Sequence, residues 1–179
     1  MPRIDSKDLT VAFEETHSET PRGAAIVLTA ILEAALEDCM CARLLPDPMS
    51  NTHRETLFGG ESHFSSFSAK IDLGYSLGLY GPKTKADLHR IRAIRNQFAH
   101  YSPRSFSHEK VIKHCRDLTD YVPSHLVYKA PEPEIEKHLA EAVEFNMRWR
   151  FIHCVHKIGV DLWDEVKQKH LPPKPTVLP

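Results

Sequence analysis

The feature that most constrains the fold is a long segment that is apolar around its whole circumference. Thr20 and Pro21 have the form of a helix start, with threonine as the N-cap and proline in the first turn, and they lead into GAAIVLTAILEAALEDCMCARLL. A helix without a clear polar face must be covered on several sides, so we expect it at the centre of a helical bundle. Glu33 and Glu37 stand one turn apart within it. Their burial requires cationic or hydrogen-bond-donating partners.

The remaining pattern predicts further helices and no strands. Gly74 and Gly78 give a strip of small residues that another helix could approach closely, and the prolines and glycines of residues 46–60 indicate a surface loop. We therefore predict an all-α antiparallel helical bundle in one domain, residues 1–170, followed by a flexible proline-rich tail at 171–179. Besides the central segment, apolar residues recur at helical spacing in five stretches: 5–16, 62 or 63 to 81, 84–101, 107 or 108 to 123, and 135–169.

The composition fits a folded protein of the cytoplasm. Apolar residues make up 41% and charged residues 26% of the 179 residues, which excludes a disordered chain and a membrane bundle. The formal net charge of -1 gives the whole molecule no polyelectrolyte character. The start of the chain has no secretory signal, and the longest apolar run, Ala24 to Leu36, is too short to span a bilayer. We expect cytoplasmic localisation, no membrane contact, and reduced thiols at Cys39, Cys41, Cys115 and Cys154.

Positive charge is concentrated between Lys83 and Arg116. This stretch holds nine Lys or Arg against two acids, a local balance of +7, together with four histidines. Such a surface could hold a phosphate backbone. The equally weighted alternative is that these cations form the solvated side of two amphipathic helices. If the stretch binds nucleic acid, the candidate contacts are Arg90, Arg92, Tyr101 and Arg104.

The segment RNQFAH, residues 95–100, ends the basic helix. On a helical wheel, Arg95 falls within the apolar stripe formed by Leu88, Ile91, Ile94 and Phe98. An arginine placed there needs acceptors, and Glu33 and Glu37 are the candidate ion-pair partners. Asn96 and His100 lie one turn apart on the opposite face, where they could meet solvent, a ligand or a second subunit.

The stretch FSSFSAKIDLGYSLGLYGPKTKADLHRIRAIRNQFAHYS resembles the signature of the mannitol operon repressor (MltR) family. The resemblance spans about residues 24–118 and is strongest between Phe64 and His100. It implies an all-helical fold and a role in repressing mannitol utilisation genes, without a recognisable DNA-binding motif. It secures neither the first 20 residues nor those after Pro131.

RNQFAH is also similar to the Arg-x4-6-His motif of HEPN domains. In ribonucleases of that type, two protomers bring their motifs together and cleave RNA without a metal. Carried over, Arg95 would stabilise phosphate charge, His100 would act as general acid or base, and Asn96 would position them. Because many HEPN-like proteins use this arginine structurally or are inactive, catalysis is the minority interpretation.

Other constellations give weaker signals. His153, Cys154 and His156, with the Cys39-x-Cys41 pair elsewhere, lack the spacing of a complete zinc site, so we expect no metal. Nucleotide-binding glycine patterns are absent from the sequence, and we expect no cofactor. A helix-turn-helix around residues 81–82 is disfavoured because the second helix carries a full core stripe. Trp149 lies between two arginines and could stack a base, although a core or interface position is more typical of its spacing.

These observations lead to two competing functions. The first is a non-enzymatic regulator similar to the mannitol repressor, which would bind a protein partner or nucleic acid through residues 83–116. The second is a metal-independent HEPN-type endoribonuclease or toxin, so enzymatic activity is uncertain and less expected than its absence. Either protein would be a homodimer, because the small-residue strip and the Asn96 and His100 face both suit a partner subunit.

Overall fold

The computed structural model describes residues 11–12, 14–16, 18–44, 51–101, 105–119 and 135–168. Within these stretches every regular element is a helix, which confirms the all-α class. No described helix is long and apolar enough to cross a membrane. The elements are α2 (Pro21–Leu44), α3 (Asn51–Phe58), α4 (Phe67–Ser76), α5 (Pro82–His100), α6 (Glu109–Arg116) and α7 (Ile135–Gln168).

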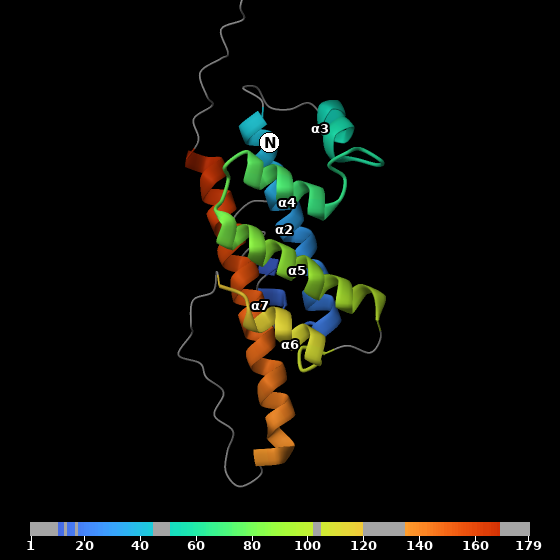
Figure 1. Ribbon diagram of the computed structural model, residues 1–179, viewed down its shortest axis with the longest axis vertical. Coiled ribbons are helices and arrows are strands. Elements are labelled where there is room, and N and C mark those ends of the chain that lie inside the picture. The colour runs from blue at the N-terminus through green and yellow to red at the C-terminus, as the bar shows by residue number, and fades with distance from the viewer. Residues whose placement is uncertain are drawn as a thin grey trace, which may run out of the picture.

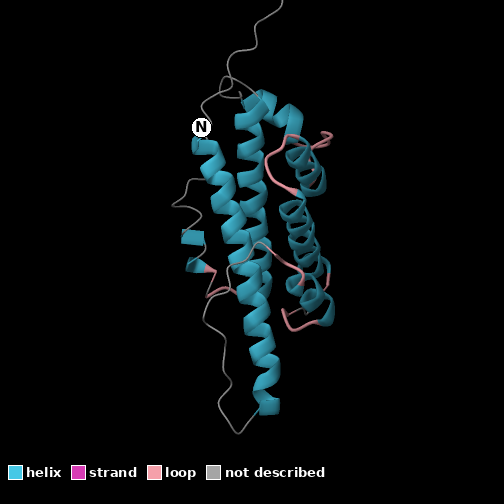
Figure 2. Ribbon diagram, turned by 60° about the vertical axis from the view of Figure 1, so that its left-hand side comes forward, coloured by secondary structure: helices cyan, strands magenta, loops and turns pink. Residues whose placement is uncertain are grey.

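Helices α2 and α7 lie side by side along the length of the molecule (Figures 1 and 2). The expected cap is present: the Thr20 hydroxyl accepts a hydrogen bond from the Gly23 N–H at 3.0 Å. As the apolar sequence predicts, α2 packs against α4, α5 and α7. The colours of Figure 1 show that α2 and α7 run in the same direction. The antiparallel arrangement expected from the sequence therefore does not extend to this pair.

Helices α4 and α5 form an antiparallel hairpin that crosses α2 (Figure 1). The Ser66 side chain caps α4 by accepting from the Ala69 N–H. The turn after α4 is closed by bonds from Gly78 N to the Tyr75 carbonyl and from Leu79 N to the Gly74 carbonyl. This is a Schellman motif, in which Gly78 takes the left-handed conformation with φ +69°.

The two glycines of the expected strip have different roles. Gly74 is buried, and a Cβ there would lie 2.6 Å from the Tyr80 hydroxyl and 3.1 Å from the Leu36 side chain. Close approach of α2 is therefore confirmed at Gly74. Gly78 lies in the turn with open space around it, so it serves backbone conformation and not helix packing.

Helix α6 and the residues before it close the bundle against α5 and α7. Phe106 is completely buried, with ring centroids 4.9 Å from Phe98 of α5 and 5.4 Å from Phe151 of α7. Val111 and Cys115 face inward as expected. The helix ends at Arg116, earlier than the sequence predicts, and residues 120–134 lie outside the described part of the chain.

Three further predicted segments differ from the structure or lie outside it. Residues 51–58 form helix α3, although the sequence indicated a loop across 46–60. Of the helix expected at 5–16, residues 11–12 and 14–15 are helical, Thr16 lies in a turn, and residues 5–10 and 13 lie outside the described residues, as does the tail expected at 171–179.

Candidate ligand-binding site

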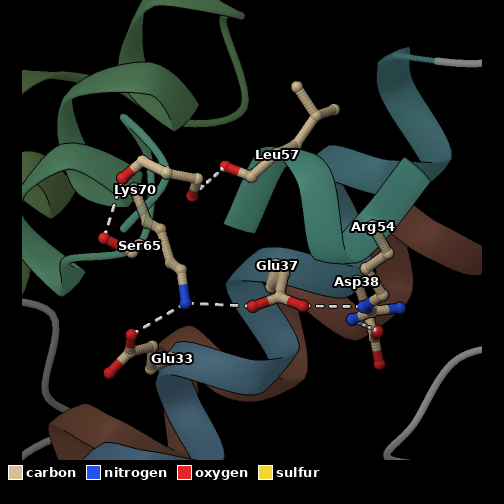
Figure 3. Close-up of polar contacts among 8 residues, drawn as sticks. Glu33, Glu37, Asp38, Arg54, Leu57, Ser65 and Lys70 are labelled. Carbon is tan, nitrogen blue, oxygen red and sulfur yellow. Dashed lines mark hydrogen bonds and ion pairs between the residues drawn. The ribbon is translucent and has the colours of Figure 1, made fainter. Parts of the chain in front are cut away.

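A chain of buried ion pairs joins α2, α3 and α4 (Figure 3). The Lys70 ammonium lies 2.9 Å from a carboxylate oxygen of Glu33 and 2.9 Å from one of Glu37. Arg54 continues the chain, with Nε 2.6 Å from the other Glu37 oxygen and a terminal nitrogen bonded to Asp38. The acidic pair of α2 thus obtains the cations that its burial requires, from Lys70 and Arg54.

The pKa values of this cluster show which effect dominates. Burial alone would raise the pKa of Glu37, but the hydrogen bonds and charges of Lys70 and Arg54 outweigh it, and the pKa is lowered. Burial would likewise lower the pKa of Lys70, yet Glu33 and Glu37 hold it above its ordinary value. Glu37 and Lys70 therefore remain charged inside the protein, within a connected network.

Two further acids of the family-like segment bind neighbouring helices. Asp72 lies 2.8 Å from the Lys85 ammonium, which lowers the pKa of the Asp72 carboxyl. Asp87 is fully buried and accepts bonds from the Thr119 N–H and hydroxyl, both at 2.8 Å, and from Arg90 at 2.7 Å. The charged residues of this signature therefore hold the helices together.

Arg95 occupies a different place from the one the helical wheel predicted. Its side chain is exposed, and its guanidinium donates to the Asn96 side-chain oxygen at 3.2 Å. The expected ion pair with Glu33 and Glu37 is not formed, because Lys70 binds both carboxylates. The four apolar residues of the stripe are buried as predicted: Leu88, Ile91, Ile94 and Phe98.

Arg95 is exposed because of the place at which the neighbouring helix α4 begins. Helix α4 begins at Phe67, so the side of α5 beside Arg95 faces the first residues of α4 and not a continuing helix. A pocket of about 450 Å³ opens at this point. Its walls come from α5 (Arg92, Arg95, Asn96), from the start of α4 (Ser65, Ser66, Phe67, Ser68) and from one stripe of α2 (Ile26, Thr29, Ala30, Glu33).

The other candidate residues lie outside this pocket. His100 is exposed at the end of α5, and no hydrogen bond among the described residues joins it to Asn96, which is half-buried and bonded to Arg95. Arg90 is bound to Asp87, and Tyr101 is exposed. Arg104 lies outside the described residues. The structure thus brings Arg95 together with Arg92 and Asn96.

The histidines and cysteines considered for metal binding lie in the packed interior or stack on neighbouring rings. The described residues contain no group of three or more His, Cys, Asp or Glu that could hold a metal ion. His153 stacks on Trp149 with ring centroids 4.7 Å apart. All four cysteines are buried thiols, and burial raises the pKa of Cys115 to about 12.

The sequence reasoning missed Lys70 and Arg54 as partners of the acidic pair. A usable signal for Lys70 was present: it stands three residues after Phe67 and four before Gly74, so it shares the inner face of its helix with them. Arg54 had no such signal, because the sequence around it contains few apolar residues.

Comparison with known proteins supports the fold. No protein-family model and no curated protein sequence matches this chain. Its structure is similar to that of MtlR in the X-ray structure of the MtlR-HPr complex from Escherichia coli. The TM-score is 0.67 at 13% sequence identity, over 87% of this chain and 98% of the other. The chain has the MtlR fold. This confirms the all-helical fold expected from the resemblance to the mannitol operon repressor family.

Proposed function

We propose that this protein is a regulator similar to the mannitol operon repressor and that it acts by binding a protein partner. The observation that carries the proposal is the likeness of fold, which extends over 98% of a chain solved in complex with HPr. A fold shared over that length places the helices in equivalent positions, which supports partner binding on equivalent faces. HPr is accordingly the first partner to test.

The surroundings of the basic helix favour protein contacts over direct reading of DNA. Helix α5 turns Leu88, Ile91, Ile94 and Phe98 into the core, so it cannot project into a groove. Two of its cations, Lys85 and Arg90, are bound to Asp72 and Asp87. An atypical nucleic-acid contact would depend on the exposed cations of residues 83–116, which are Lys83, Arg95, Lys110, Lys113 and Arg116 among the described residues.

The experiment is a calorimetric titration of the purified protein with HPr from the same organism. We expect saturable binding of one HPr per protomer. A matched pair of variants controls for surface charge: Arg95→Glu, on the exposed end of α5, and Lys157→Glu, on α7. Absence of HPr binding by the folded protein, with salt-sensitive binding to promoter DNA, would replace the protein-partner proposal with direct repression.

A HEPN-type endoribonuclease is the second candidate function. The accessibility of its residues favours it: Arg95 and His100 are both exposed, and Asn96 bonds to Arg95. Such a site would be completed by a second protomer, so this candidate requires the homodimer predicted from the sequence. Size-exclusion chromatography with light scattering measures the mass of the protein in solution and so shows whether it is a dimer.

RNA cleavage separates the two candidates. Labelled RNA is incubated with the protein in EDTA, beside His100→Ala and Arg95→Ala. Cleavage that disappears in a folded His100→Ala variant would establish the ribonuclease and refute a regulator without enzymatic activity. We expect no cleavage. We also expect both variants to fold, because both side chains lie at the surface.

A further inference from the structure

The pocket between α2, α4 and α5 contains positive charge without a matching acid. Arg92 and Arg95 lie one turn apart on α5 and both line it. The Nε of Arg92 is buried and makes no hydrogen bond to any described residue. Arg95 bonds within the described structure to the neutral side chain of Asn96. Two guanidinium groups that face a cavity without a carboxylate partner indicate an anionic ligand.

The one acid in the lining is already neutralised. Glu33 points to Lys70, and Figure 3 shows the ammonium between the Glu33 and Glu37 carboxylates. The cations Arg92 and Arg95 are therefore not offset by Glu33. The charge that remains in the pocket is positive.

The opposite wall supplies hydrogen-bond donors. Ser66 and Ser68 line the pocket at the start of α4. The amides of the first two helical residues, Phe67 and Ser68, have no acceptor within the helix, and the positive end of the helix dipole lies there. Hydroxyls, free amides and two guanidinium groups are together the donor set that binds phosphoryl oxygens.

The size of the cavity selects among phosphorylated ligands. A volume of about 450 Å³ lies in the range of small-molecule sites and exceeds the needs of a bare phosphate ion. The α2 wall of Ile26, Thr29 and Ala30 carries no charge and suits the organic part of a ligand. We propose that this pocket binds a small organic phosphate monoester, with Arg92 and Arg95 holding the phosphoryl group against the start of α4.

Ligand binding at this site requires neither HPr nor His100, although Arg95 and Asn96 also belong to the HEPN-like motif. His100 does not line the pocket, so ligand binding requires neither the general acid or base of the HEPN motif nor a second protomer. Binding of the ligand and binding of HPr are measured separately. Failure of one proposal therefore leaves the other standing.

The test is calorimetric titration of the full chain at low salt with inorganic phosphate, glycerol 3-phosphate and dimethyl phosphate. We expect glycerol 3-phosphate to bind most tightly and dimethyl phosphate, a diester with a single charge, to bind weakest. Arg92→Gln and Arg95→Gln should each weaken monoester binding about tenfold or more. Arg92→Lys should recover part of the loss because it restores the charge without the planar fork.

Controls make each outcome decisive. Arg43→Gln, an exposed arginine of α2 outside the pocket, and His100→Ala should bind the monoester like the unaltered protein. Thermal unfolding of every variant verifies the fold. The proposal is overturned if no phosphate probe binds, if Arg92→Gln and Arg95→Gln bind unchanged, or if an RNA oligonucleotide without terminal phosphates binds more tightly than the monoester.

Discussion

At the scale of single residues, the most consequential side chain is Lys70. It is buried and bridges two carboxylates of the central helix, one of which, Glu37, is also buried. Removing one member of a buried network leaves the opposite charge without its partner, which costs far more than the loss of a surface ion pair.

We predict that Lys70→Ala lowers the free energy of unfolding by about 3 kcal/mol, because Glu37 then stays buried with Arg54 as its remaining cation. Lys85→Ala is the matched control, since it breaks the ion pair with the exposed Asp72 and should cost under about 1 kcal/mol. Urea unfolding followed by circular dichroism measures both. Equal losses in the two variants would contradict the burial argument.

Lys70 and Arg95 also show how far a helical wheel reaches. The apolar circumference of α2 correctly predicts that Glu33 and Glu37 need cations, because the polarity of a buried position is a local property of its helix. The wheel of α5 assigns the wrong cation because Arg95 is covered only where a neighbouring helix runs beside it, and α4 begins at that level. The level at which a neighbouring helix begins beside a residue is set by the tertiary structure and cannot be read from the pattern of one helix.

At the scale of elements, the boundaries of α5 were predicted to within two residues, 84–101 against 82–100, and the existence of α3 was not predicted. Gly81 and Pro82 set the start of α5, and Ser102 and Pro103 follow its end, so backbone chemistry alone defines the helix. Helix α3 has eight residues and low mean hydropathy. Its attachment depends on the ion pairs of Arg54 with two acids of α2, which no local pattern encodes.

The turn between α4 and α5 gives a prediction at this scale. Gly78→Ala should lower stability by about 1 kcal/mol, because φ is +69° there and a side chain in the left-handed region is strained even in open space. Gly78→Asn should recover part of that loss. Denaturant titrations of the two variants provide the comparison, and an unchanged stability in Gly78→Ala would refute the role of backbone strain.

At the scale of the whole molecule, the aromatic cluster around Phe106 joins α5 to α7, which is distant in sequence, through the residues that precede α6. Phe106 contacts Phe98 and Phe151 and has no exposed surface. We predict that Phe106→Ala lowers the free energy of unfolding by roughly 3–5 kcal/mol through the cavity it leaves. Phe64→Ala, at a half-buried ring 6.5 Å from Phe58, should cost clearly less. A similar shift of the denaturation midpoint in both variants would contradict the cluster's role.

The fold class was predictable because α2 has no polar face, and a helix of that kind needs several neighbours. The relative direction of α2 and α7 was not predictable. It depends on the route of the chain through α4, α5 and α6 before α7 begins. Helical periodicity predicted the individual helices. The resemblance of residues 24–118 to the mannitol repressor family predicted the fold that they form together.

The dependence of stability on pH follows from groups whose pKa is lowered in the folded protein. Burial lowers the pKa of His114 and of His156, so the unfolded chain binds protons more readily than the folded one below about pH 6.5. Lys70 and Arg54 lower the pKa of Glu37, so its contribution is present above about pH 4.5 and is lost as the pH falls through its folded pKa. Stability should therefore decrease in two steps on acidification.

We expect the free energy of unfolding to be highest near pH 7.5, to fall below about pH 6.5 as the histidines protonate, and to fall again below about pH 4.5 as Glu37 does. Urea denaturation at fixed ionic strength across this range measures both steps. His156→Gln should diminish the upper step and leave the lower one, because Gln does not titrate, whereas Lys70→Met should reduce the lower step by removing a cation that keeps Glu37 ionised. A stability that is constant from pH 7.5 to 5.5 would show that burial of these imidazoles does not oppose their protonation.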